Sequence, residues 1–377
     1  MNSKVPPLVV ALVILLTFLA IGVWVWGSGE AKKIGGPAGL RVDPDGHLFI
    51  QIQNQLLEHD ADGVFLKQHD LGAMGAEIIL GSVVFFSDGD ILLRLGTDPR
   101  SLYDNVRAYQ RLTNERSLSP QSPGSGLYRC DLDTAVCQRF GTDGVDFKAA
   151  YSVFIDWQTD DVYIADTTRH LLRKYSANGD ALAEPVGGFL FPNQLLLDGE
   201  RLFVVDTNHH QIRIVNKDSG RFGEKIEAVN VVPDLAARTG QTWPTHIARV
   251  DNEWWVNNMR TGMNEGGIYI FDNDWRYDRS VTLPPDADPI ALVALGDEVL
   301  ISDWNNDRIY RVARTGQRLD DFSSSGLEQV LAESRKTRLQ YTIYSYAGIA
   351  LFILVLAGIF IRAMAMPKPE NDTKSSV

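Results

Sequence analysis

The segment LFVVDTNHHQIRIVNKDSG, from Leu202 to Gly220, joins two strand-like runs through a polar turn. Its first run is apolar and ends at Asp206, and its second run alternates apolar and polar residues before the turn at Gly220. Alternation with a period of two, bounded by turn residues, predicts a β-hairpin. The pair His209 and His210 beside Asp206 also has the residue types of a metal or catalytic site, so the segment supports two interpretations.

The same pattern recurs in VYIADTTRHLLRKYSANGD and VLISDWNNDRIYRVARTGQ, where Asp166 and Asp303 occupy the place of Asp206. His209 does not recur, because the other two segments carry arginine and asparagine there. A metal or catalytic set is needed at one centre, whereas a residue present in each repeat supports each repeat. A short acceptor at a strand end can bind backbone N–H groups of the next turn. We therefore expect a structural role for the three aspartates and exposed turn positions for His209 and His210.

Another strand precedes each hairpin and a short strand follows it, so each repeat of about 40 to 50 residues holds four strands. Six preceding strands can be recognised, and they begin near Pro37, Gly75, Ala150, Pro192, Pro244 and Pro289. Four antiparallel strands in a repeat of this length are typical of a propeller blade. The sequence therefore predicts an all-β fold, a six-bladed β-propeller of four-stranded antiparallel blades over residues 36–323. The second repeat is degenerate and carries an insertion, residues 97–125, which we expect to be a surface loop.

The repeats resemble those of the NHL-repeat family of six-bladed β-propellers, in which a strand ending in Asp is followed by a second strand with the pattern apolar-aromatic-apolar-x-Asp-x-x-Asn. The three strand-end aspartates match that second pattern, and Asn208 and either Asn305 or Asn306 lie near its Asn. The fifth repeat departs from it, with Asn258 in place of the Asp. The resemblance implies a six-bladed ring but not an activity, because such rings host interaction modules, lyases and lactonases.

Two uncharged apolar runs, residues 8–26 and 343–361, flank the repeats. At a rise of about 1.5 Å per residue, each helix would span roughly the hydrocarbon core of a bilayer. Tryptophans close the first run and tyrosines open the second, as interfacial anchors do. We expect two transmembrane helices, the first of them an uncleaved signal anchor. A cleaved signal peptide is the alternative for the first run, and buried core helices are the alternative for both.

The remaining segments are short. Residues 1–7 and 362–377 form an N-terminal and a C-terminal tail outside the two apolar runs. Residues 325–340 have apolar side chains at helical spacing, which predicts an amphipathic helix. It is either a stalk leading into the second span or a helix that packs on the ring.

The chain has two cysteines, Cys130 and Cys137. A hairpin turning at Asp133 and Thr134 would place them opposite one another, which predicts a disulfide and hence an oxidising compartment; two reduced thiols are the alternative.

We expect a bacterial inner-membrane protein with the propeller in the periplasm and both termini in the cytoplasm. A net charge of −12 argues against a nucleic-acid partner. The expected partners are the bilayer, through two spans, and a membrane or envelope protein.

Propeller sites commonly lie in the central channel, at the mouth formed by the starts of the innermost strands. Aligning these starts places polar side chains there that could hold a divalent cation or position a water, namely Glu77, Tyr151, Asn193, Gln194 and His246. The chain also resembles, more distantly, the gluconolactonase-like propellers, which bind a metal in this region, and Pro192-Asn193 matches the start of their Pro-Asn-Gly. Gln194 replaces the Gly of that motif, and Ala38-Gly39 stands where an acidic residue is expected. The alternative is a solvated polar channel.

The sequence contains no G-x-S-x-G, P-loop or H-E-x-x-H motif. We therefore assign no catalytic residue, no metal ligand and no cofactor, with a divalent cation in the channel as the exception to test. The expected function is a membrane-tethered scaffold that binds a protein or another ligand in the cell envelope. The alternatives are a channel-site hydrolase of the lactonase-like type and a sensor that reports ligand occupancy through its two helices.

Overall fold

The computed structural model describes residues 6–76, 83–95, 126–141, 147, 150–231, 243–260 and 265–365. The chain divides into two compact units. One unit is Gly35–Leu331, and the other combines Met1–Ile34 with Ala332–Val377. Glu77 and the insertion at 97–125 lie outside the described residues, as do most of the two terminal tails.

The described strands of Gly35–Leu331 form six antiparallel sheets, and in each sheet the strands follow one another in chain order. These sheets are the blades of the predicted propeller, and we number them 1 to 6. Blade 1 is β1 (Gly39–Val42), β2 (Leu48–Ile52), β3 (Gln55–His59) and β4 (Phe65–Asp70); blade 2 is β5 (Val84–Phe85), β6 (Ile91–Leu95), β7 (Gly126–Cys130) and β8 (Cys137–Arg139). Blade 3 is β9 (Ser152–Asp156), β10 (Asp161–Asp166) and β11 (Leu171–Tyr175); blade 4 is β12 (Pro192–Asp198), β13 (Arg201–Asp206), β14 (Gln211–Asn216) and β15 (Lys225–Asn230). Blade 5 is β16 (Trp243–Val250), β17 (Glu253–Met259), β18 (Gly266–Phe271) and β19 (Tyr277–Ser280); blade 6 is β20 (Pro289–Leu295), β21 (Glu298–Asp303) and β22 (Arg308–Ala313).

The predicted fold, a six-bladed β-propeller of four-stranded antiparallel blades, is confirmed. In blades 3 and 6, isolated bridges mark the place of the fourth strand, for example the bridge between Val312 and Arg318. The register repeats between blades, since Pro192 lies opposite Asp206 in blade 4 and Pro244 lies opposite Asn258 in blade 5. The repeat pattern in the sequence therefore corresponds to the same strand positions in space.

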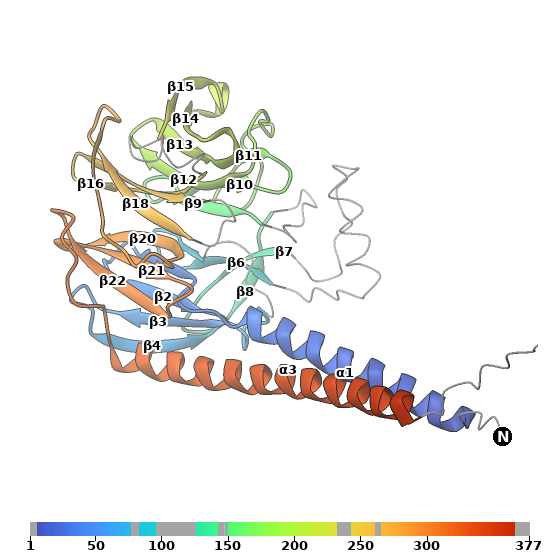
Figure 1. Cartoon of the computed structure of the whole chain (residues 1–377). Helices are drawn as coiled ribbons and strands as arrows, with labels where there is room; N and C mark the ends of the chain where they lie inside the picture. Colours follow the sequence, from blue (N-terminus) through green and yellow to red (C-terminus); the bar gives the residue numbers. More distant parts are fainter. Residues whose placement is uncertain are drawn as a thin grey trace, which may run out of the picture. The chain divides into compact units, whose positions relative to one another are not determined.

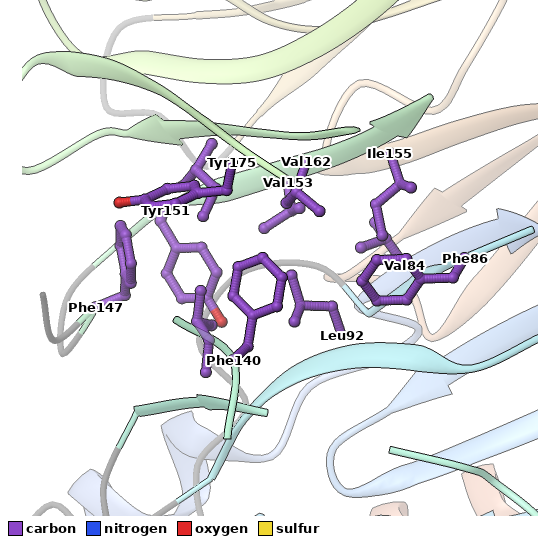
Figure 2. Packing of buried hydrophobic residues seen from close by; sticks show 12 residues of the cluster. Val84, Phe86, Leu92, Phe140, Phe147, Tyr151, Val153, Ile155, Val162 and Tyr175 are labelled. Carbon is purple, nitrogen blue, oxygen red and sulfur yellow. The ribbon is translucent and has the colours of Figure 1, made fainter. Parts of the chain in front are cut away.

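Neighbouring blades are held together by apolar clusters that each draw side chains from two blades. Figure 2 shows the cluster between blades 2 and 3, in which Val84 and Leu92 lie beside Val153 and Ile155. Both faces of each blade are therefore covered, so its strands can be apolar on both sides. Burial of apolar surface between blades is the main stabilising contribution to a ring of this kind.

The ring closes by packing of blade 6 against blade 1, which lie side by side in Figure 1 as the orange and blue sheets. Leu40 and Ile50 of blade 1 share a cluster with Leu300 of blade 6. The start of the last helix joins this cluster, because Leu327 and Leu331 are buried in it. Residues 325–340 were expected to form either a stalk or a helix that packs on the ring. The first two turns of this helix pack on the ring.

Two helices are long and apolar enough to cross a membrane, judged by length and composition only. They are α1 (Pro7–Lys33) and α3 (Ser325–Ala365), with a mean hydropathy of 3.0 and 2.4 in their most apolar stretches. The segment expected to be a stalk and the apolar run at 343–361 belong to one uninterrupted helix, α3. Within the helical unit, α1 and α3 approach closely at Gly27 and Gly348, where an added Cβ would lie 2.7 Å and 2.5 Å from backbone nitrogens of the other helix.

The hairpin of β7 and β8 carries the predicted disulfide. Cys130 and Cys137 pair directly across the two strands and are joined by a disulfide bond. The turn between them is fastened by Asp131, whose carboxylate accepts hydrogen bonds from the backbone N–H groups of Asp133 and Thr134. The predicted pairing of the two cysteines is confirmed.

Candidate functional site

The innermost strands of the six blades, β1, β5, β9, β12, β16 and β20, surround a central channel. Near the starts of these strands the channel holds a cavity of about 40 Å³, lined among others by Gly39, Gln51 and His246; we call it the neck. Toward the strand ends lies a cavity of about 640 Å³, which we call the funnel. The funnel is lined by residues 40–42, 84–85, 153–158, 194–197, 199–200, 217, 247–249 and 292–294, so that all six blades contribute to its wall.

The side chains expected at the channel mouth have different surroundings. Tyr151 is buried in the cluster between blades 2 and 3, where its ring lies 5.2 Å from that of Phe147. Asn193 donates a hydrogen bond from Nδ2 to Thr207 Oγ1 at 2.8 Å, and this hydroxyl in turn donates to the carbonyl of Pro244. Tyr151 therefore packs between two blades, whereas Asn193 is bonded within blade 4 to a hydroxyl that reaches blade 5.

Gln194 and His246 reach the channel. Gln194 lines the funnel, and its Oε1 accepts a hydrogen bond from the backbone N–H of Ile247 in the next blade. His246 lines the neck. Glu77, the carboxylate expected to complete this set, lies outside the described residues. The structure thus brings together an amide and an imidazole from adjacent blades.

His246 is enclosed in the channel wall. Burial, together with the positive charge of Arg41, lowers the pKa of its imidazole to about 3, so that the ring is neutral at physiological pH. Its Nδ1 lies 3.2 Å from Thr245 Oγ1. A neutral imidazole offers one N–H donor and one acceptor, and it can bind a polar group in the neck without adding charge.

Arg41 lines both the neck and the funnel and therefore lies where the two cavities meet. Its Nη1 donates a hydrogen bond to the carbonyl of Leu40 at 2.7 Å. Among the described residues, no carboxylate forms an ion pair with it. Burial lowers the pKa of its guanidinium to about 10, which leaves the group charged at neutral pH.

Arg249 lines the funnel from blade 5. Its guanidinium lies over the ring of Trp254, 4.5 Å from the ring centroid, and its Nη2 donates to Asn273 Oδ1 at 2.6 Å. Its Nη1 is buried without a hydrogen-bond partner. Like Arg41, it has no carboxylate partner within the described part of the chain.

A third cation on the funnel wall is neutralised locally. Lys217 Nζ lies 3.1 Å from a carboxylate oxygen of Asp156 and 3.5 Å from one of Glu200. Burial alone would lower the pKa of Lys217, but the hydrogen bond and charge of Asp156 outweigh burial and raise it. The two arginines therefore supply the excess positive charge of the funnel wall.

The strand-end aspartates lie away from the channel cavities and accept hydrogen bonds from backbone N–H groups. Asp206 is fully buried; its Oδ1 accepts a hydrogen bond from the backbone N–H of Leu190 at 2.6 Å, and its Oδ2 lies 2.9 Å from Arg213 Nη2. In blade 6, Asp303 Oδ1 accepts a hydrogen bond from the backbone N–H of Asp288 at 3.0 Å. In blade 3, Asp166 Oδ1 accepts one from the backbone N–H of Arg169 at 3.2 Å.

The two adjacent histidines differ from each other. The Nδ1 atom of His209 lies 2.8 Å from Asp206 Oδ2, so the His209 side chain takes part in the hydrogen bonds of the turn. His210 has a left-handed backbone, with φ of 56°, and its ring packs against that of Trp243. Within the described ranges, no three side chains of His, Cys, Asp or Glu converge as metal ligands would.

Sequence reasoning missed Arg41 and Arg249. By strand register, Arg41 occupies the place of Phe154, Leu196 and Val293 in blades 3, 4 and 6, and Arg249 occupies that of Ile155, Leu197 and Ala294. An arginine in an otherwise apolar innermost strand was therefore the available signal. Its meaning depends on which side chains face the channel, and the repeat pattern alone does not specify that.

The sequence matches no protein-family model, and no curated protein matches it significantly. Solved structures resemble the chain at low identity. A virginiamycin B lyase from Staphylococcus aureus is 13% identical, with a TM-score of 0.47 over 76% of this chain and 84% of that one. A functionally unknown protein from Desulfotomaculum acetoxidans is 10% identical, with a TM-score of 0.48 over 77% of this chain and 85% of that one.

A chain of the nidogen/laminin complex is 11% identical, with a TM-score of 0.47 over 78% of this chain and 94% of that one. At these identities and TM-scores the likenesses carry no argument about ligand or activity. The six-bladed fold rests on the strands and inter-blade clusters of the chain itself.

Proposed function

We propose that the protein is a membrane-tethered β-propeller of the NHL-like type that binds a small-molecule ligand in the funnel. The funnel itself is the main support for this function. Its volume of about 640 Å³ lies within the range of about 300–1,000 Å³ that is usual for small-molecule sites, and most of its lining is apolar. All six blades build its wall, so the ring holds its shape rigidly.

Binding is favoured over hydrolysis by the roles of the polar side chains at the strand starts. Asn193 is bonded to Thr207 of its own blade and Gln194 to the next blade, and among the described residues the charge that acts on the imidazole of His246 is that of Arg41. A general base needs a partner that orients it and stabilises its protonated form, and a nearby positive charge does the opposite. The described residues therefore support recognition of a ligand more than its cleavage.

The two apolar helices and the disulfide support the proposed location. We place the ring in the periplasm of a bacterial inner membrane, with both termini in the cytoplasm and a membrane or envelope protein as a partner. Labelling of two single added cysteines, Asp62→Cys in the ring and Ser3→Cys in the tail, tests the topology. In intact spheroplasts an impermeant maleimide is expected to label the first and not the second, and the reverse pattern would contradict this placement.

The binding role is tested on the full chain in lipid nanodiscs by saturation-transfer NMR. The probes are three compounds with the same apolar body, naphthoate, naphthamide and naphthylmethylammonium. At least one is expected to bind, and Ala294→Phe, which places a large side chain in the funnel, should abolish that binding. Ala313→Phe at the end of β22 is the matched control. Failure of every probe, or equal binding by both variants, would refute the proposed function.

A further inference from the structure

We propose that the funnel selects an organic anion, with an apolar body in the funnel and one carboxylate-like group bound to Arg41 at the entrance to the neck. This inference rests on the proposed function, because it assumes that the funnel holds a ligand. It goes further in naming the chemical class of that ligand and its orientation in the channel.

The first support is the position of Arg41. Arg41 lines both cavities, it is partly buried, and among the described residues no carboxylate forms an ion pair with it. A partly desolvated charge without a counter-ion is costly, and a bound anion would reduce that cost. A planar guanidinium also matches a carboxylate geometrically, since two of its N–H groups can donate in parallel.

The second support is Arg249, an independent cation on the same wall. Its ring contact with Trp254 and its bond to Asn273 hold the guanidinium in place, while its buried Nη1 lacks a hydrogen-bond partner. Because this nitrogen has almost no exposed surface, Arg249 would act on a bound anion through its charge rather than through a direct hydrogen bond from Nη1. Two arginines without carboxylate partners give the funnel a charge that favours anions over neutral compounds.

The third support is the distribution of polar and apolar groups along the channel. The neck, about 40 Å³ in volume, is slightly larger than the roughly 30 Å³ that one water occupies in the liquid, so it has room for a small polar headgroup only. Gln51 and the neutral His246 line it and can serve as hydrogen-bond partners. Val153, Phe154 and Leu197 line the wider funnel and suit an apolar body. The ligand should therefore enter with its anionic group toward Arg41.

Isothermal titration calorimetry of the full chain in nanodiscs tests the inference, with empty nanodiscs as the partition control. Wild-type protein should bind naphthoate at least tenfold more tightly than naphthamide, because a hydrogen-bonded ion pair in an enclosed site contributes about that factor or more. Arg41→Gln should weaken naphthoate binding about tenfold or more and leave naphthamide binding unchanged. Arg41→Lys should retain part of the preference, and Arg276→Gln, at an exposed turn, should change nothing.

The outcomes separate this inference from the proposed function. Equal affinity for naphthoate and naphthamide, or an Arg41→Gln protein that binds naphthoate as wild type does, would overturn the anion inference while ligand binding stands. If neither compound nor the cationic probe binds, ligand binding in the funnel fails as well. Near-ultraviolet circular dichroism of the variants shows whether each is folded. If Arg41→Gln does not fold, Arg249→Gln takes its place, with a loss of at least threefold in naphthoate affinity as the expected result and no loss as the contrary one.

Discussion

The start of α3 should contribute strongly to closure of the ring, and Leu327→Ala measures that contribution. Leu327 is 1% exposed and packs in the cluster that joins blades 1 and 6. The substitution removes three buried carbons at about 0.8 kcal/mol each, or roughly 2.4 kcal/mol of transfer free energy. The cavity that remains raises the expected loss of unfolding free energy to about 3–5 kcal/mol.

Urea unfolding of the full chain in detergent, followed by near-ultraviolet circular dichroism of its aromatic side chains, gives this free energy. Leu339→Ala is the control, because Leu339 is on the same helix and 59% exposed. Its expected effect is below about 0.5 kcal/mol. If the two variants lose the same small amount of stability, the first turns of α3 do not help to close the ring, and closure must then rest on the contacts between blades 1 and 6 alone.

Three further predictions concern other parts of the chain. Gly348→Leu should separate α1 from α3, because the added Cβ would meet the backbone of α1. Gly358→Leu is the control and should leave the helices together, because Gly358 has open space around it. Energy transfer between dyes on the two helices measures the difference. Asp206→Asn should cost about 1.5–3 kcal/mol of stability, since the buried carboxylate loses its charge and its ion pair with Arg213. The same change at the exposed Asp198 should cost less than about 1 kcal/mol in urea unfolding. His246 has a pKa of about 3 in the folded protein and about 6.5 in the unfolded chain. The free energy of unfolding should therefore fall as pH drops from about 6.5 toward 3, because the unfolded chain binds a proton that the folded one does not. His246→Gln should flatten this part of the pH profile of the unfolding free energy.

The fold followed from the sequence because its signals are local and repeated. Pro192 and Pro289 begin innermost strands where the pattern placed them, and Asp206 and Asp303 accept backbone hydrogen bonds from the segments that lead into those strands. The degenerate second repeat was harder. Its innermost strand was expected near Gly75, whereas the described strand β5 begins at Val84 and turns back through Phe86, whose N–H donates to the carbonyl of Asp90. Two apolar runs compete for this role, and periodicity alone does not choose between them.

The site was less accessible to sequence reasoning because it depends on contacts between blades. Gln194 lines the funnel and is bonded to the backbone of Ile247 in the next blade, whereas Asn193 is bonded to Thr207, which follows β13 in its own blade. Which end of the channel is wide depends on the sizes of side chains from all six blades together. The expectation centred on the strand starts, whereas the larger cavity lies toward the strand ends.

A structure of the full chain with bound bromonaphthoate tests the central claim most directly. We predict the bromine in the funnel, among residues such as Phe154 and Leu197, with the carboxylate oxygens within hydrogen-bond distance of the Arg41 guanidinium. Ligand density on the outer surface of the blades, or in the funnel with the carboxylate turned away from Arg41, would contradict that claim.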